Sequence, residues 1–242
     1  MSSQLKSPSF SLNSPHFLIE LRARLLRVLF IFFIVFALLA YFANDLYQWL
    51  SLPMLKFLPQ GHLIATQIIS PFFVPFKLAF ITAILIIAPY FLYEIWAFIT
   101  PALYGHERRL IWPFLFISAF LFYIGLAFAY FIIFPMLFNF LSHLTPKTVT
   151  LSPDISEYLD FTIKLLLVFG TLFEIPIIMV LLVATGVVTR AVLLSIRPYA
   201  IVGAFVIGML FAPPDVFSQT ILALPIWFLY EIGLLFCKKK KY

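Results

Sequence analysis

Charged residues, cysteines and clustered histidines are all scarce in this sequence. Only 11% of its 242 residues are Asp, Glu, Lys or Arg, whereas 64% are hydrophobic and 19% are aromatic. Soluble domains are about half apolar and about one quarter charged, so this composition excludes a soluble globular protein. The single cysteine, Cys237, excludes an intrachain disulfide and a cysteine-based metal cluster. The four histidines lie too far apart for a zinc site, so we expect no cofactor: His16, His62, His106 and His143.

The sequence also lacks a basic groove interleaved with aromatic residues, although its net charge is +6. The cations stand at the edges of apolar runs, a distribution that argues against nucleic-acid binding. Residues 1–14 are polar and lack the basic start and apolar core of a removable signal peptide. Lipid is therefore the expected solvent for most of the chain.

Long apolar runs are what the sequence has instead. A helix needs about 20 apolar residues to cross a hydrocarbon core of about 30 Å. An open strand in lipid would leave backbone groups unpaired, so each run must be helical. We predict an all-α, polytopic membrane protein in which residues 1–242 form one domain of six transmembrane helices. The predicted spans are residues 25–43, 72–98, 110–141, 161–188, 198–212 and 216–236.

Proline interrupts several of these spans, and the fifth span is short. Each internal proline removes a backbone donor and kinks its helix, which predicts a curved, concave bundle. The span at 198–212 covers only about 23 Å at about 1.5 Å per residue. This shortness reflects either simple packing among neighbours or a deliberately thinned membrane. Prolines within the spans include Pro75, Pro89, Pro135, Pro176 and Pro225.

Positive charge is distributed unequally between the two sides of the spans. By the positive-inside rule, both termini are predicted to face the cytoplasm. The predicted cytoplasmic side carries Lys6, Arg22, Arg24, Arg27, Arg108, Arg109, Arg190, Arg197 and the lysines at 238–241. The opposite side carries Lys56 and Lys147 among the acids Asp45, Asp154, Glu157, Asp160 and Asp215.

Five ionisable residues inside the predicted spans are functional candidates, because an ionisable group is costly there. Lys77, Lys164, Glu94 and Glu231 stand near the ends of their spans, and we expect their side chains to reach the interface. Glu174 stands well inside span four. It is either a neutral acid bonded to a neighbouring helix or a polar docking point for a partner helix or a passing ligand.

The predicted cytoplasmic face contains two carboxylates among its many cations, Glu20 and Glu107. Glu20 is four residues before Arg24, the spacing of an ordinary helical ion pair. Glu107 precedes span three, where an acid suits a helix N-terminus. Alternatively, two separated carboxylates at the cytoplasmic surface of the membrane suit a ligand with guanidinium groups, which carboxylates bind bidentately.

At these residues the chain resembles the TatC family, the multi-span receptor of the twin-arginine protein translocase. The resemblance covers nearly the whole chain and includes the H-x-x-x-E-L-R-x-R-L run that begins at His16. Six segments match in order: residues 16–25, 70–73, 96–109, 169–176, 197–199 and 213–219.

The resemblance implies a bacterial inner-membrane receptor without catalytic chemistry, which binds twin-arginine signal peptides of folded cargo. It implies single-span TatA-type and TatB-type partners, self-association, and export driven by the proton-motive force. The implied signal-peptide residues are Glu20 and Glu107, with Arg22, Phe98 and Arg109 nearby. Glu174 would be the intramembrane partner site, and the outer-loop residues tied to assembly are Pro53, Asp215 and Gln219.

Four positions depart from the family's usual pattern. Ala212 stands where the family usually has Thr, and Gln67 stands where it often has an acidic residue. Phe17 replaces a common Leu, and Glu94 replaces a common Gln.

Two function classes other than a receptor are small-solute transport and intramembrane catalysis. A proton-coupled small-solute transporter is the main alternative, because Glu174, Glu94 and Glu231 could form a relay. An intramembrane enzyme is disfavoured, since the sequence contains neither H-E-x-x-H nor G-x-S-x-G.

Overall fold

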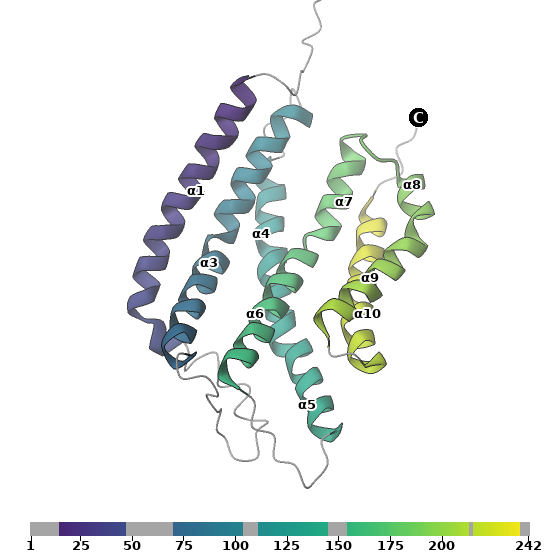
Figure 1. The fold of residues 1–242 in the computed structure, drawn as a ribbon. Helices are drawn as coiled ribbons and strands as arrows, with labels where there is room; N and C mark the ends of the chain where they lie inside the picture. Colours follow the sequence, from purple (N-terminus) through teal and green to yellow (C-terminus); the bar gives the residue numbers. More distant parts are fainter. Residues whose placement is uncertain (1–14, 47–69, 104–110, 145–153, 213–214, 238–242) are drawn as a thin grey trace, which may run out of the picture.

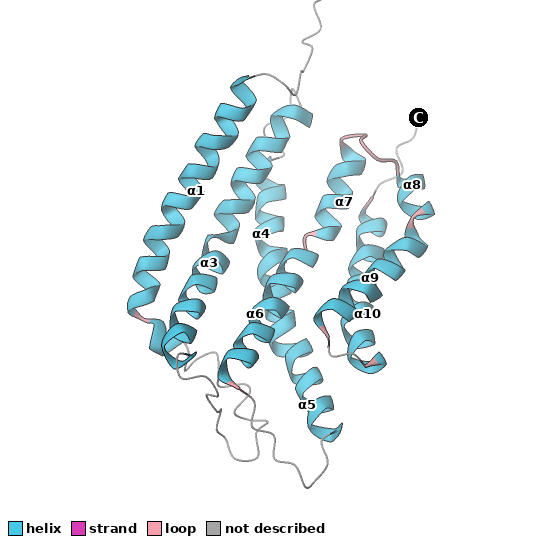
Figure 2. Ribbon diagram, in the orientation of Figure 1, coloured by secondary structure: helices cyan, strands magenta, loops and turns pink. Residues whose placement is uncertain are grey.

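The computed structural model describes residues 15–46, 70–103, 111–144, 154–212 and 215–237 (Figure 1). The regular structure of these residues is helical (Figure 2). The helices are α1 (Pro15–Tyr41), α3 (Ser70–Leu103), α4 (Ile111–Phe128), α5 (Phe134–Leu144), α6 (Ile155–Leu172), α7 (Ile175–Ala184), α8 (Arg190–Ser195), α9 (Arg197–Phe211) and α10 (Val216–Phe236).

Five segments of these helices are long and apolar enough to cross a membrane, and α9 is a sixth, shorter apolar helix. The prediction of an all-helical polytopic protein is therefore confirmed. The five segments are Ile19–Tyr41, Phe72–Ala97, Pro113–Phe140, Ser156–Ala184 and Val216–Phe236.

The helices pack side by side in an antiparallel arrangement. Helix α1 packs on α3, α3 packs on α4 and α6, and α10 packs on both α7 and α9. The start of α1 and the end of α10 lie at the same end of the bundle, at the top of Figure 1. The ends of α3 and α7 lie at this upper end as well.

The predicted third span is continuous but not regular. A π-helical turn, η2 (Ala129–Ile133), joins α4 to α5, and the Phe134 N–H bonds to the Ala129 carbonyl five residues earlier. Pro135 follows at once; it has no N–H, and its ring would press on the preceding turn of a regular helix. The wider turn thus lies where proline disturbs the hydrogen-bond ladder.

The predicted fourth span is broken rather than merely kinked. Helix α6 ends at Leu172 and α7 begins at Ile175, with Phe173 and Glu174 between them (Figure 2). Pro176 occupies the first turn of α7, where its missing N–H is tolerated. The Leu172 carbonyl therefore has no donor four residues on, which explains why α6 stops here.

The main apolar core lies where η2 and α5 meet α6. Phe134, Leu137, Leu159 and Phe169 are at most 1% exposed there. Gly125 lets α4 approach closely, since a Cβ at this position would lie 2.6 Å from the Phe169 carbonyl oxygen. Close backbone contact at small residues is the usual way in which helices associate in lipid.

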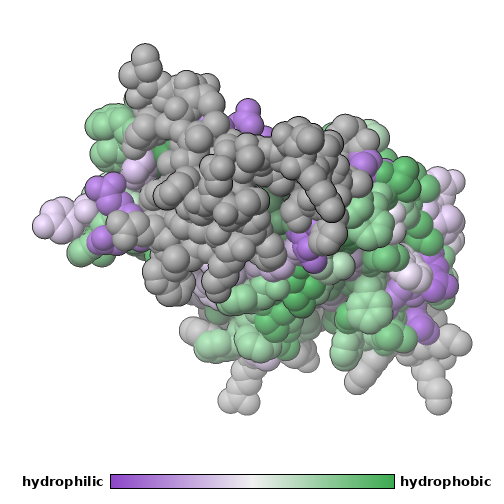
Figure 3. All heavy atoms as spheres, turned by 90° about the horizontal axis from the view of Figure 1, so that it is seen from below, coloured by the Kyte–Doolittle hydropathy of each residue, from purple (hydrophilic) through white to green (hydrophobic). Residues whose placement is uncertain are grey.

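The outer faces of the bundle are apolar, as a lipid solvent requires. Along α1, Phe30, Phe33 and Leu38 are all more than half exposed. In the view from the lower end, apolar side chains likewise cover outer faces of the described helices (Figure 3).

Candidate functional site

A charged cluster joins the first turns of α1 to the last turns of α3, at the upper end of the bundle. The Arg24 guanidinium donates to Glu20 Oε1 through Nη2 at 2.7 Å and through Nε at 3.2 Å. Its third nitrogen, Nη1, lies 2.7 Å from Glu94 Oε2. The predicted i,i+4 pair of Glu20 and Arg24 is therefore present, and Arg24 also reaches a second acid on the neighbouring helix.

Glu94 is the buried member of this cluster, with only 4% of its surface exposed. The Tyr90 hydroxyl donates to Glu94 Oε1 at 2.8 Å, and Arg27 Nη1 lies 3.4 Å from the same oxygen. Buried charges are tolerated only when they are paired and hydrogen-bonded. Two arginines and a tyrosine therefore hold the Glu94 carboxylate within the protein.

The members of the cluster differ in exposure. The Glu20 side chain is 54% exposed and the Arg24 side chain is 17% exposed. Arg22 is exposed on the same helix. The cluster thus presents an accessible carboxylate supported by a buried one.

Several predicted site residues lie outside what the structure describes. Glu107, Arg109 and Pro53 are outside the described residues. Phe98 lies in α3, but its side chain is also outside the described set. The structure therefore gives no distance between the two predicted signal-peptide carboxylates.

Glu174 occupies the break between α6 and α7 and is 4% exposed. The Ser118 hydroxyl, on α4, donates to Glu174 Oε2 at 2.5 Å. The Trp96 indole N–H, on α3, donates to the Ser118 oxygen at 3.1 Å. A buried polar chain thus links three helices and holds one oxygen of this acid.

The other oxygen of Glu174 is buried without a hydrogen-bond partner among the described residues. A buried acceptor without a donor is costly, and such groups in native proteins call for an explanation. One oxygen of this carboxyl group is therefore an unpaired acceptor inside the bundle, as far as the described residues go.

Local sequence explains how Ser118 meets Glu174. Ser118, Phe122 and Gly125 are spaced i, i+4 and i+7, so they share one face of α4. Phe122 packs on Gly170, where a Cβ would lie 2.8 Å from its ring, and Gly125 packs on the Phe169 carbonyl. The close approach at the two glycines brings the serine within bonding distance of the acid.

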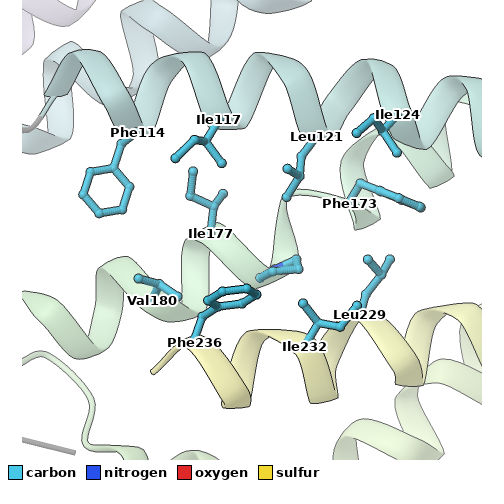
Figure 4. Close-up of a pocket in the computed structure, with 11 residues that line it drawn as sticks. Phe114, Ile117, Leu121, Ile124, Phe173, Ile177, Val180, Leu229, Ile232 and Phe236 are labelled. Atoms are coloured by element: carbon cyan, nitrogen blue, oxygen red, sulfur yellow. The ribbon is translucent and has the colours of Figure 1, made fainter. Parts of the chain in front are cut away.

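An apolar cavity of about 540 Å³ lies between α4, α7 and α10 (Figure 4). Phe173, which precedes Glu174, and Pro176, two residues after Glu174, contribute to the wall of this cavity. The side chains drawn in Figure 4 are Phe114, Ile117, Leu121, Ile124, Phe173, Pro176, Ile177, Val180, Leu229, Ile232 and Phe236.

Asp215 and Gln219 shape the junction between α9 and α10. Asp215 caps α10 by accepting from the Ser218 N–H at 2.7 Å. The Gln219 amide donates to the Phe205 carbonyl at 2.9 Å, and Gly208 allows the two backbones to approach. These two predicted assembly residues therefore fix the geometry of a tight helical pair.

Glu231, the third acid of the proposed relay, is engaged elsewhere. Its Oε1 accepts from Arg197 Nε at 2.5 Å and from the Trp227 indole at 3.1 Å. Glu94 and Glu231 each bind arginine, whereas Glu174 bonds to Ser118. The three carboxylates thus have separate partners on separate helices.

Sequence reasoning missed Ser118, Trp96 and the role of Glu94 in the cluster. Ser118 gives no signal beyond being a polar residue in an apolar run. Across the described ranges, the structure contains no group of three His, Cys, Asp or Glu residues that could hold a metal ion.

Known proteins resemble this chain over most of its length. The family model described as TatC, Sec-independent protein translocase protein, matches residues 16–225. The chain is 52% identical to the Sec-independent protein translocase protein TatC of Escherichia coli (strain K12), over 91% of this chain and 86% of that protein. It is 53% identical to the protein of the same name from Haemophilus influenzae, over 90% of this chain and 86% of that one.

Solved structures give the same result. A crystal structure of the twin-arginine translocase receptor TatC matches with a TM-score of 0.82 and 39% identity, and the match covers 91% of this chain and 97% of that one. A second crystal structure of this receptor, in the detergent DDM, matches with a TM-score of 0.83 and 38% identity over 92% and 99% of the two chains. On this evidence the chain belongs to the TatC family of Sec-independent protein translocase proteins.

Proposed function

We propose that this chain is the receptor subunit of a twin-arginine translocase in the bacterial inner membrane. The family supports this function, because its members are protein translocase components rather than enzymes. The similarity to structures of a twin-arginine translocase receptor supports it further.

One observation in the structure carries the proposal. Glu20 is a half-exposed carboxylate that already binds a guanidinium group, that of Arg24, through two N–H donors. Carboxylates and guanidinium groups form charge-assisted hydrogen bonds of this kind with high geometric selectivity. A signal peptide with paired arginines is a ligand that such a carboxylate can bind.

The remaining members of the site are proposed from their family positions. Glu107 would bind the second arginine, with Arg22, Phe98 and Arg109 around it. Arg22 is exposed on α1, close in sequence to Glu20, which is compatible with this role.

The apolar part of the signal peptide and the partner subunits would interact inside the membrane. The unpaired oxygen of buried Glu174 supports a polar contact with a partner helix, of TatA type or TatB type. Pro53, Asp215 and Gln219 would contribute to assembly, including self-association. Export would be driven by the proton-motive force.

We further propose that both termini face the cytoplasm. The start of α1 and the end of α10 lie at the same end of the bundle, which also includes Arg24, Arg27 and Arg197. The distribution of lysine and arginine in the sequence supports this orientation.

The proposed function is tested by complementation. Cells that lack their own TatC would express this chain, and the export of a folded cargo with a twin-arginine signal would be measured. We expect export with the wild type and its loss with Glu20→Ala and with Glu107→Ala. Glu157→Ala makes the same chemical change at an exposed residue of α6, on the lower end of the bundle, and should leave export intact. Undiminished export by the Glu20→Ala, Glu107→Ala double variant would overturn the assignment.

A further inference from the structure

We propose that Arg24 is an internal competitor of the signal peptide: its guanidinium occupies Glu20 until a peptide arginine replaces it. Glu94 is the second carboxylate of this exchange, which keeps Arg24 paired after Glu20 releases it. The inference rests on the proposed function of Glu20 and adds a mechanism to it. Ligand binding at this site is then an exchange of one guanidinium for another.

The geometry separates the contacts of Arg24 into an outer and an inner one. Its Nε and Nη2 both point to one oxygen of Glu20, at 3.2 Å and 2.7 Å. Its Nη1 bonds to Glu94 at 2.7 Å. The guanidinium is planar with its donors in fixed directions, so it can lose the outer acceptor without moving off the inner one.

Exposure decides which contact breaks first. The outer partner, Glu20, is 54% exposed, and ion pairs between exposed side chains are weak in water. The inner partner, Glu94, is 4% exposed, and removing the partner of a buried charge is strongly unfavourable. A competing guanidinium therefore displaces Arg24 from Glu20 and leaves it on Glu94.

Glu94 is itself firmly held, so it can serve as the anchor. The Tyr90 hydroxyl at 2.8 Å and Arg27 at 3.4 Å both engage its other oxygen. Two glutamates and two arginines make the cluster electrically neutral. When a peptide arginine takes over Glu20, Arg24 and Arg27 share Glu94, which both of them already contact.

The exchange also favours arginine over lysine in the ligand. Arg24 gives Glu20 two donors from one rigid group. A peptide guanidinium replaces both donors, whereas an ammonium is a compact charge without this planar fork. A lysine peptide must therefore displace a better donor group than the one it supplies.

The test measures the Kd of a labelled twin-arginine signal peptide for the purified protein in detergent. Arg24→Gln removes the competitor, so affinity should rise about threefold, the scale of one exposed ion pair. Glu94→Gln removes the alternative partner and ties Arg24 to Glu20, so affinity should fall about threefold. The two changes have opposite signs, whereas a merely structural role would weaken binding in both variants.

Three further variants complete the design. The Arg24→Gln, Glu94→Gln double variant should bind like Arg24→Gln, because Glu94 acts on Glu20 only through Arg24. Arg24→Lys keeps the positive charge but lacks the planar set of guanidinium donors, so it should also tighten peptide binding. Arg190→Gln, at the start of α8, removes one positive charge at the same end of the bundle and should leave the Kd unchanged.

The outcomes separate this inference from the function it rests on. If Glu20→Ala abolishes binding but Arg24→Gln weakens it, the receptor role stands and the exchange is wrong. An unchanged Kd in Glu94→Gln would also overturn the exchange. Full binding by Glu20→Ala would refute the role of Glu20 and the exchange together.

Discussion

Gly125 is a position at which a single added methyl group should destabilise the bundle. A Cβ there would lie 2.6 Å from the Phe169 carbonyl oxygen and 3.0 Å from the Phe173 Cβ. Ordinary contact begins near 3.4 Å, so α4 and α6 would have to separate by roughly 0.8 Å in a closely packed interior. The obstacle is a backbone atom of α6, which has no rotamer by which to move aside.

The magnitude follows from two opposing effects. Overpacking a close-packed interior costs about 1–3 kcal/mol. Replacing glycine by alanine inside a helix stabilises the helix by about 0.5–1 kcal/mol. We therefore expect Gly125→Ala to lower the free energy of unfolding by about 1 kcal/mol. Because Ser118 lies two turns away on the same face of α4, the 2.5 Å hydrogen bond from Ser118 to Glu174 should lengthen as well.

Equilibrium unfolding in mixed micelles with increasing SDS measures this difference. Gly203→Ala is the matched control, since a Cβ at Gly203 in α9 would meet nothing within 4 Å. The control should be neutral or slightly stabilising. Equal unfolding midpoints for the two variants would refute the claim that close contact between α4 and α6 depends on Gly125.

Three other changes have defined outcomes. Asp215→Ala removes the cap on the Ser218 N–H and should cost about 1 kcal/mol, with faster hydrogen exchange at that amide, whereas Asp215→Asn should retain most of the protection. Glu174→Gln keeps an oxygen that accepts from the Ser118 hydroxyl, so the free energy of unfolding should change by less than about 0.6 kcal/mol. Cargo export should fall in this variant, and retained export would count against a role of Glu174 in binding a partner. A double-mutant cycle on Arg197 and Glu231 should give a coupling of about 0.5 kcal/mol, and zero coupling would show that water already screens this pair.

The predicted spans show what apolar runs can and cannot specify. The span predicted at 216–236 coincides with α10, because Asp215 caps its start and lysines follow its end. The span predicted at 25–43 begins ten residues after α1 does, since the helix continues through the charged turns from Pro15. Hydropathy locates the part of a helix that lies in lipid, but not the part that projects from it.

Breaks within spans were harder to predict than the spans. Five prolines were expected to kink their helices, and at Pro225 the helix continues without interruption. The chain interrupts regular helix at Pro135, through η2, and at Pro176, through the break after α6. A missing donor alone does not decide the outcome, because neighbouring groups can satisfy the freed carbonyl.

The polar site was only partly predictable for a similar reason. The pair of Glu20 and Arg24 follows from spacing along one helix. The contact of Arg24 with Glu94 joins residues 70 positions apart, and no periodicity links them. Ser118 likewise meets Glu174 only because Gly125 and Gly170 let α4 and α6 approach.

Glu20, an exposed carboxylate on α1, is proposed to recognise paired arginines. This role is tested by the affinity of the purified protein for a twin-arginine signal peptide and for the same peptide with two lysines, compared between wild type and Glu20→Ala. We predict tight binding of the arginine peptide alone, lost in the variant. Equal binding of both peptides, unaffected by Glu20→Ala, would contradict the receptor function while leaving the helical fold in place.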